Sequence, residues 1–180
     1  MLELRINGFG GQGSVTLAHL LANAALENGE KGQALPFFGV ERRGAPVRAA
    51  VRISPDTINA YSRCEEPDYV VVMSEKLLPA AQVEGIKTNG SYIVNSAYAV
   101  PKPENASAWY VDADGIATQY GLFSTDGPFI NVPLFGAICR VLDIPVHIVK
   151  QTIAKKFSDI SGEKNMKAAL TAYDSVKIVD

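Results

Sequence analysis

The sequence predicts an α/β fold in which a mostly parallel, twisted sheet is flanked by helices and followed by a helical C-terminal third. Strand-like and helix-like segments alternate along the first two thirds of the chain. The runs 68–73 and 91–95 are β-branched and apolar almost throughout, as central strands covered on both faces are. From Pro133 onward, apolar residues recur at helical spacing. At 180 residues, we expect a single domain spanning 1–180.

In the first third, we expect strands at 2–7, 34–38 and 47–53, and a helix that follows a glycine-rich turn and runs to about Asn28. Gly29 and Gly32 end this helix, and one of its faces carries Leu17, Leu20, Leu21 and Ala24. The strand at 47–53 alternates in character, so that one face has Val47, Ala49, Val51 and Ile53 and the other has Arg48, Ala50 and Arg52. The alternation predicts one dry face and one basic face.

The rest of the chain predicts three further strands and a set of helices. The strands are 68–73, 91–95 and 108–112, with only short helices between them, at 75–78 and 115–120. Three longer helices begin near Pro133, Pro145 and Glu163, each with apolar residues three or four positions apart.

Composition and charge exclude several classes of protein. Lys and Arg total 17 and Asp and Glu total 19, for a net charge of −2, which argues against a dedicated nucleic-acid binder. An iron–sulfur cluster needs about four ligands, and the only cysteines are Cys64 and Cys139, so we expect no metal in this chain. We see no secretory signal and no apolar run of the roughly 20 residues that cross a bilayer, and we expect a cytoplasmic protein without membrane contact.

A glycine-rich turn connects the first strand to the first helix. Gly8, Gly10 and Gly13 have the G-x-G-x-x-G spacing that makes such a strand–helix unit Rossmann-like, and the helix start can bind an anion such as a phosphate. A dinucleotide site also needs a carboxylate at the end of the second strand, and residues 36–39 contain none. The turn therefore indicates another phosphate-bearing or packing partner, with a purely structural turn and an NAD site as alternatives.

The segment 39–63 is locally basic. It has five arginines against Glu41 and Asp56, a local charge of +3 in a chain whose net charge is −2. Arginine binds carboxylates and phosphates through two parallel hydrogen bonds and is frequent at interfaces. The segment is interpreted as a ligand or subunit contact, with a solvated strand face as the alternative.

Motifs for catalysis are missing. His19 and His147 lie on predicted helices without a nucleophile motif nearby, and the chain has no GxSxG, P-loop or HExxH pattern. Asn131, two residues before Pro133, is interpreted as a helix cap, with a ligand contact as the alternative. We expect no catalytic residue in this chain, which does not look like a complete enzyme.

The sequence resembles the gamma subunit of the 2-oxoacid:ferredoxin oxidoreductases, the pyruvate, 2-oxoglutarate and 2-ketoisovalerate group. The resemblance covers nearly the whole chain, and its most specific motifs are RINGFGGQG at 5–13 and FGVERRGAPVR at 38–48. Val40 is a departure, because the family usually has proline there. Further matches are 51–54, 67–71, Asn131 with Gly136 and Ala137, and 163–165.

The resemblance implies a subunit of an oxidoreductase that is not active alone. In the family, thiamine diphosphate lies between the alpha and beta chains, and [4Fe-4S] clusters lie mainly in a delta chain or a ferredoxin-like domain. The complex converts a 2-oxoacid and coenzyme A to acyl-CoA and CO2 and passes the electrons to ferredoxin. The gamma chain is associated with coenzyme A. The expected partners are alpha, beta and delta-type subunits, and the isolated chain is a possible homodimer.

The resemblance also implies a set of candidate binding residues. The glycine turn would approach the coenzyme A pyrophosphate or partner backbone, the arginines would contact phosphates or the alpha subunit, and Glu41 would orient them. The candidates are Gly8, Gly10, Gly11, Gln12, Gly13, Gly39, Glu41, Arg42, Arg43, Gly44, Arg48, Arg52 and Asn131.

Three other functions stay open at this point. The related indolepyruvate ferredoxin oxidoreductase beta chain opens with the same glycine-rich element, but its loop after the second strand is closer to MxQRGG than to the ERRGAP of 41–46. A non-catalytic nucleotide-binding module would need a ribose anchor that the sequence does not provide. A pure assembly subunit would bind no small molecule.

Overall fold

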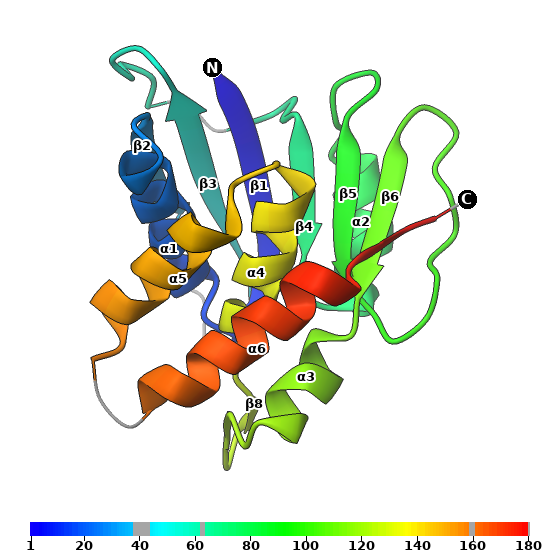
Figure 1. Cartoon of the computed structure of the whole chain (residues 1–180). Helices are drawn as coiled ribbons and strands as arrows, with labels where there is room; N and C mark the ends of the chain where they lie inside the picture. Colours follow the sequence, from blue (N-terminus) through cyan, green and yellow to red (C-terminus); the bar gives the residue numbers. More distant parts are fainter. Residues whose placement is uncertain (38–43, 62–63, 159–160, 180) are drawn as a thin grey trace.

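The computed structural model describes residues 1–37, 44–61, 64–158 and 161–179. Its centre is a seven-stranded sheet in the order β2-β3-β1-β4-β5-β6-β9, whose strands lie side by side across the view in Figure 1. The main strands are β1 (Leu2–Phe9), β2 (Lys31–Phe37), β3 (Pro46–Ser54), β4 (Tyr69–Val72), β5 (Ser91–Asn95) and β6 (Ser107–Val111), with β9 (Lys177–Ile178) at one edge. A separate two-stranded hairpin pairs β7 (Phe123–Ser124) with β8 (Gly127–Pro128).

The sheet is mostly parallel, as predicted. Strands β1, β4, β5 and β6 pair in parallel with one another. β3 pairs antiparallel with both β1 and β2, so β2 runs in the same direction as β1, and β9 runs against β6. Five of the seven strands therefore share one direction, and their carboxyl ends lie at the same edge of the sheet.

The helices are unequally divided between the two faces of the sheet. Figure 1 shows α1 (Ser14–Glu27), α4 (Asn131–Val141), α5 (Val146–Lys156) and α6 (Ser161–Ser175) on one side, and α2 (Leu78–Val83) on the other. The short helices η1 (Glu75–Leu77) and α3 (Ala113–Gln119) follow the ends of β4 and β6. No helix among the described residues is both long and apolar enough to cross a membrane.

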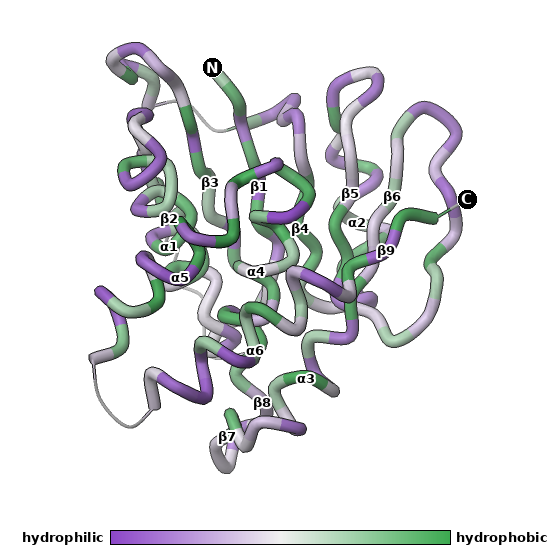
Figure 2. Tube along the Cα trace, viewed as in Figure 1, coloured by the Kyte–Doolittle hydropathy of each residue, from purple (hydrophilic) through white to green (hydrophobic). Residues whose placement is uncertain are grey.

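The main core lies between the sheet and the α1–α4–α6 layer. Leu4 and Ile6 on β1 and Leu17 and Leu21 on α1 are completely buried in it. A smaller core under α2 contains Val70, Val72, Leu77, Ala81 and Tyr92. Figure 2 shows the apolar colour concentrated on the strands and on the inner helices. Each fully buried Leu, Ile or Val side chain of these cores contributes about 1.5–3 kcal/mol to stability.

The helices α4 and α6 pack in backbone contact at Gly136. A β-carbon at this glycine would lie 1.9 Å from the carbonyl oxygen of Ala169, so no larger residue fits without moving the helices apart. Gly136 belongs to the Asn131–Gly136–Ala137 pattern of the resemblance, and the structure gives it a packing role. The contact lies at the middle of α4 and allows α6 to pack closely against it.

Two local expectations are wrong, and a third is refined by the structure. Gly32, expected to end the first helix, lies inside β2, which begins at Lys31. Asn131 is the first residue of α4 rather than its cap, because the cap position is Ile130 and no side chain caps this helix. The strand at 47–53 has Arg48 and Arg52 on the predicted face, but only Arg48 is exposed, because Arg52 is completely buried.

Candidate functional site

The glycine-rich turn lies at the carboxyl end of β1, where it leads into α1. The backbone N–H of Phe9 donates to Gln12 Oε1 at 2.7 Å, and Gln12 N donates back to the Phe9 carbonyl at 3.1 Å. The turn is also tied to the start of β3, because Gly10 N donates to the Ala45 carbonyl at 2.9 Å and Gly44 N donates to the Gly10 carbonyl at 3.2 Å. These four bonds hold the turn in one shape before any ligand binds.

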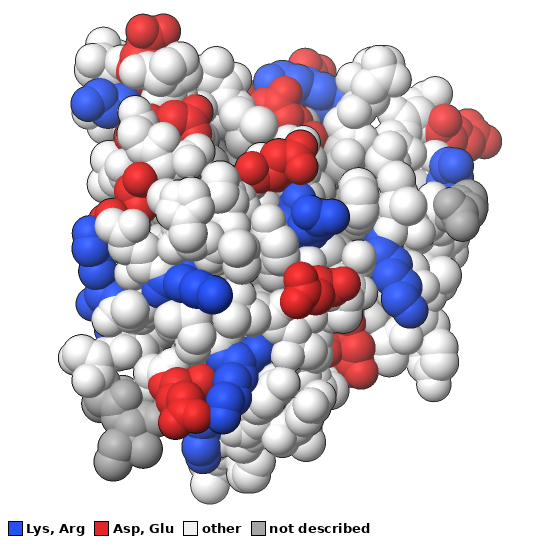
Figure 3. Space-filling view, in the orientation of Figure 1, with Lys and Arg blue, Asp and Glu red and all other residues white. Residues whose placement is uncertain are grey.

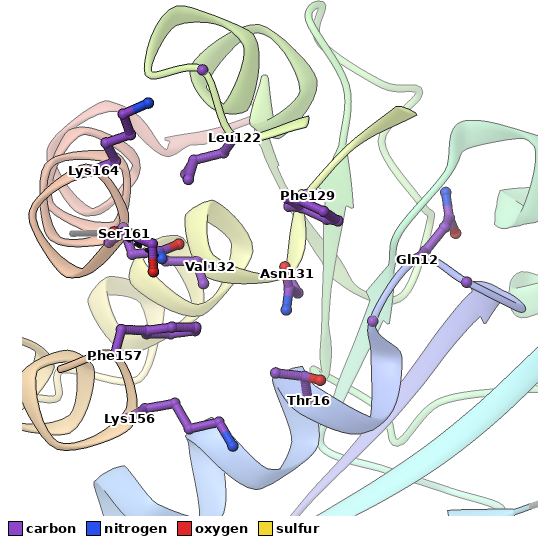
Figure 4. A pocket seen from close by; sticks show the side chains of 14 residues that line it. Gln12, Thr16, Leu122, Phe129, Asn131, Val132, Lys156, Phe157, Ser161 and Lys164 are labelled. Atoms are coloured by element: carbon purple, nitrogen blue, oxygen red, sulfur yellow. Dashed lines mark hydrogen bonds between the residues drawn. The ribbon is translucent and has the colours of Figure 1, made fainter. Parts of the chain in front are cut away.

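Gly13 brings the turn into contact with Asn131. Its φ of 82° is in the left-handed region, and a β-carbon there would lie 3.0 Å from Asn131 Nδ2. Figure 4 shows the Asn131 side chain directed toward the start of α1. No side chain caps α1, whose first turn carries the partial positive charge of a helix N-terminus. The structure thus places two distant predicted site residues side by side.

A cavity of about 680 Å³ adjoins this turn, and we call it the glycine-turn cavity. Its walls come from the turn, the segment before α4, the end of α5 and the start of α6 (Figure 4). Its volume lies within the roughly 300–1,000 Å³ typical of small-molecule sites. It is lined by Gly11, Gln12, Gly13, Thr16, Gly121, Leu122, Phe129, Asn131, Val132, Lys156, Phe157, Ser161, Lys164 and Asn165.

A second cavity of about 580 Å³ lies on the other side of the turn, next to the β7–β8 hairpin, and we call it the hairpin cavity. It shares Gly11, Gln12 and Phe129 with the first. Its other lining residues are Phe9, Gly10, Gly44, Lys76, Asp114, Ser124, Asp126, Gly127, Pro128 and Ile130. Gly10 and Gly44, both predicted site residues, therefore face this cavity.

The described lining of the glycine-turn cavity carries positive charge. Among the described residues, Lys156 and Lys164 line the cavity and no acidic residue does, and no ion pair joins either lysine to an acid. Glu163, next to Lys164 in sequence, instead pairs with Lys167 at 2.6 Å, and the hydrogen bond from Lys167 lowers the pKa of Glu163. Both cavity lysines are thus available for an anionic ligand.

The structure separates the two described arginines of β3 from each other. Arg48 lies opposite Asn7 near the glycine-turn end of the sheet, exposes 49% of its side chain and pairs with Glu84. Arg52 lies four positions further along β3, about 13 Å away at 3.3 Å per residue. It is completely buried and pairs with Glu3 at 2.8 Å, so it is remote from the turn. Gly39, Glu41, Arg42 and Arg43 lie outside the described residues.

Gly8 is packed rather than exposed. It is the second-last residue of β1, and a β-carbon there would lie 2.9 Å from the sulfur of Met73. The neighbouring Arg5 has a structural role as well, since its guanidinium donates to the carbonyls of Cys64, Glu65, Ala81 and Gly85. Burial lowers the pKa of Arg5.

The two thiols are held in the protonated form. Burial, together with the nearby Glu3 carboxylate, raises the pKa of Cys64 from 9.0 to about 11. Complete burial also raises the pKa of Cys139. Thiolate is the form that binds metals. Within residues 1–37, 44–61, 64–158 and 161–179, no three His, Cys, Asp or Glu side chains gather as metal ligands.

Sequence reasoning missed the cavity residues at the end of α5 and the start of α6. Lys156, Lys164 and Phe157 look like ordinary helix-end residues, and only tertiary packing brings them to the glycine turn. Asn165 is buried and donates from Nδ2 to the Ser161 carbonyl at 3.0 Å, which fixes the first turn of α6. The signal in the sequence is the match to the family over 163–165, which by itself does not indicate a site.

Comparisons with known proteins identify the family to which the chain belongs. The model of the pyruvate ferredoxin/flavodoxin oxidoreductase family matches residues 3–175. The chain belongs to this family. It is 41% identical to pyruvate synthase subunit PorC of Methanothermobacter marburgensis over 98% of each chain. It is 39% identical to the common subunit gamma of the pyruvate/ketoisovalerate oxidoreductases of Thermococcus kodakarensis over the full length of both. The resemblance to gamma subunits of this family is therefore confirmed.

Solved structures agree with the family assignment. Subunit PorC of the pyruvate oxidoreductase of Thermotoga maritima superposes with a TM-score of 0.82 at 35% identity and covers 99% of this chain and 98% of that one. The 2-oxoglutarate:ferredoxin oxidoreductase of Magnetococcus marinus, solved with 2-oxoglutarate, coenzyme A and succinyl-CoA bound, matches at a TM-score of 0.79. At 17% identity over 32% of that longer chain, this second likeness shows the fold alone.

Proposed function

We propose that the chain is the gamma-type subunit of a complex that converts a 2-oxoacid, coenzyme A and oxidised ferredoxin to acyl-CoA, CO2 and reduced ferredoxin. Its contribution is to bind coenzyme A and to contact the other subunits. Support comes from the family match over 3–175 and from the full-length similarity to chains named PorC and gamma. Thiamine diphosphate and the iron–sulfur clusters are assigned to the partner subunits.

The glycine-turn cavity carries the coenzyme A part of the proposal. It combines a preformed glycine turn at a helix start, two lysines and an apolar lining that includes Leu122, Val132 and Phe157. Coenzyme A is a large ligand with both phosphates and apolar parts, so a mixed cavity of this kind suits it. The turn and Asn131 approach the ligand, and the exposed part of Arg48 with Arg42 and Arg43 contacts phosphates or the alpha subunit.

Gly13→Ala tests the proposal, because it alters the cavity wall without changing charge. The new β-carbon would press on Asn131 at about 3.0 Å and would also carry the strain of a left-handed residue. In the reconstituted complex we expect the KM for coenzyme A to rise at least about fivefold, about 1 kcal/mol of binding. The KM for the 2-oxoacid should stay unchanged, because the residues that recognise that substrate are assigned to the other subunits.

Gly29→Ala is the matched control. Gly29 lies at the other end of α1 with a φ of 83°, and nothing lies within 4 Å of the position of an added β-carbon. It therefore brings a similar left-handed strain and leaves the cavity intact. If both variants raise the KM for coenzyme A equally, or if Gly13→Ala leaves it unchanged in a stably assembled complex, the cavity is not the coenzyme A site.

A further inference from the structure

Asn95 is a buried amide at the carboxyl end of β5. It is the last residue of that strand, and only 5% of it is exposed. Its Nδ2 donates to the Met73 carbonyl at 3.1 Å and to Asp114 Oδ2 at 2.7 Å. Its Oδ1 accepts from Ala113 N at 3.0 Å. One side chain therefore joins the ends of β4 and β5 to the start of α3, which lies beyond the carboxyl ends of these strands in Figure 1.

These three bonds require an amide. Two of the partners, the Met73 carbonyl and the Asp114 carboxylate, are acceptors, and the third, Ala113 N, is a donor. An asparagine amide offers two N–H donors and a carbonyl acceptor, whereas an ionised carboxylate of the same shape only accepts. An aspartate at this position would therefore turn oxygen toward oxygen at two of the three contacts.

Met73 connects Asn95 to the glycine turn. It is completely buried, and its N–H donates to the Asn7 carbonyl at 2.9 Å. A β-carbon on Gly8 would lie 2.9 Å from the Met73 sulfur, so the methionine side chain packs directly against the Gly8 backbone. Gly8 is the second-last residue of β1, from which the turn starts. A shift of Met73 would therefore displace the strand end that carries the turn.

Asp114 connects Asn95 to the wall on the other side of the turn. It lies in the first turn of α3 and lines the hairpin cavity. α3 leads into the β7–β8 hairpin, because Leu122 N donates to the Ala117 carbonyl at 2.8 Å and Phe129 N donates to the Leu122 carbonyl at 2.7 Å. Phe129 lines both cavities. The start of α3 therefore sets where the hairpin lies relative to the turn.

We propose that Asn95 is a positioning residue for the candidate site at the glycine turn. It lines neither cavity, and it fixes the turn through Met73 and the hairpin through Asp114. The distance between the two sides of the site thus depends on one buried amide. The inference rests on the proposed function only for the identity of the ligand, since the positioning is measurable in the chain without a ligand.

Asn95→Asp tests the proposal, because it keeps the shape of the side chain and removes both donors. Hydrogen exchange of the full chain, followed by mass spectrometry of its peptides, reports on both connections. The segments 9–13 and 121–129 each contain hydrogen-bonded N–H groups, so their exchange rates measure local opening. We expect both segments to exchange at least about fivefold faster in the variant than in the wild type.

The kinetics of the reconstituted complex provide a second measurement. A displacement of about 1 Å in positioning groups can cost up to about a hundredfold in rate or affinity. In Asn95→Asp we expect the KM for coenzyme A to rise at least about fivefold, while kcat at saturating coenzyme A changes less than about twofold. A loss of folded complex alone would lower kcat and leave the KM unchanged.

The double variant Asn95→Asp/Asp114→Asn separates the two connections. The amide at position 114 can donate to the carboxylate at position 95, which restores the bond to α3, whereas the Met73 carbonyl still lacks its donor. Exchange at 121–129 should return to the wild-type rate, and exchange at 9–13 should stay fast. Asp114→Asn alone keeps an acceptor for Asn95, so it should leave both segments unchanged.

Asp68→Asn controls for a general loosening of the sheet. Asp68 precedes β4 at the opposite edge of the sheet, and its carboxylate accepts from Glu3 N at 2.8 Å and from Lys87 Nζ at 3.0 Å. The variant weakens these bonds far from the turn, so exchange at 9–13 and the KM for coenzyme A should not change. If Asn95→Asp does not fold, Met73→Leu replaces it: the packing against Gly8 changes at nearly constant volume, and exchange at 9–13 alone should rise.

Unchanged exchange at 9–13 in Asn95→Asp and in Met73→Leu would overturn the inference. An equal increase in Asp68→Asn would overturn it as well, because the effect would then belong to the sheet as a whole. Faster exchange at 9–13, with an unchanged KM for coenzyme A in both Asn95→Asp and Gly13→Ala, would support the positioning role and refute the proposed function. The two proposals therefore fail on different measurements.

Discussion

Arg52 allows a test that separates a structural role from a ligand contact, because its side chain is completely buried. Nε donates to Glu3 Oε1 at 2.8 Å, and Nη1 donates to the Ala60 carbonyl at 3.0 Å and to Gln33 Oε1 at 3.3 Å. Arg52→Met removes these bonds and leaves the Glu3 carboxylate, with only 19% of its side chain exposed, without this cation.

The expected cost of Arg52→Met is about 3 kcal/mol of the free energy of unfolding. Removing one partner of a buried ion pair costs about 3–5 kcal/mol, and the apolar methionine recovers a part of the packing. The measurement is urea unfolding of the full chain followed by circular dichroism. The double variant Arg52→Met/Glu3→Leu should be less destabilised than the sum of the two single variants, because it leaves no charge buried alone.

The same variant also separates Arg52 from the ligand site. Complexes that assemble with Arg52→Met should keep the wild-type KM for coenzyme A, since Arg52 is about 13 Å along β3 from Arg48 at 3.3 Å per residue. A stability loss below about 1 kcal/mol, with single effects that simply add, would refute the buried ion pair as a structural element. A raised KM at unchanged stability would make Arg52 a ligand contact.

Three further predictions concern packing, pH and the basic segment. Gly136→Ala should lower the free energy of unfolding by about 1–3 kcal/mol through overpacking against Ala169, although Gly→Ala in a helix interior ordinarily stabilises; a rise in Tm would contradict the α4–α6 contact. The pKa of Cys64 is raised to about 11 in the folded state, so the unfolded state loses the proton first as pH rises. The free energy of unfolding should therefore fall between about pH 9 and 11, by up to about 1.4 kcal/mol per pH unit. The fall should be smaller in Cys64→Ala, and equal falls in the variant and the wild type would show that Cys64 is not its source. Arg43→Ala should weaken either the coenzyme A dependence or the assembly of the complex, and if the reconstituted complex keeps both, the segment has neither role.

The sheet was largely predictable because its central strands are short apolar runs whose character does not depend on context. β5 spans 91–95, as predicted, and β4 lies within the predicted 68–73. The insertion of β3 between β2 and β1 was not predictable, because strand order depends on contacts between distant residues. β7, β8 and β9 have two residues each, too few for any periodicity to appear.

The candidate site was predictable where backbone conformation requires a particular residue. Gly13 has a positive φ and faces Asn131, and both residues were predicted site members. Lys156 and Lys164 could not be found by the same reasoning, since a lysine on a polar helix face is ordinarily solvated and only the packing of α5 and α6 brings these two together. The alternation in β3 identified the face of Arg52 correctly but could not show that Glu3, Gln33 and Ala60 cover it.

The local charge of a sequence window is therefore a poor guide to where an anion binds. Arg48 and Arg52 gave the segment 39–63 much of its positive charge, yet their acidic partners, Glu84 and Glu3, lie outside that segment. Figure 3 shows acidic and basic side chains mixed over the face formed by α4–α6, without a large patch of one sign. A cavity whose described lining has two lysines and no acid can still concentrate positive charge on such a surface, because salt screens charges that lie more than about 10 Å away. For this reason the binding of an anionic ligand in the glycine-turn cavity should depend on Lys156 and Lys164 more strongly than on the net charge of the chain.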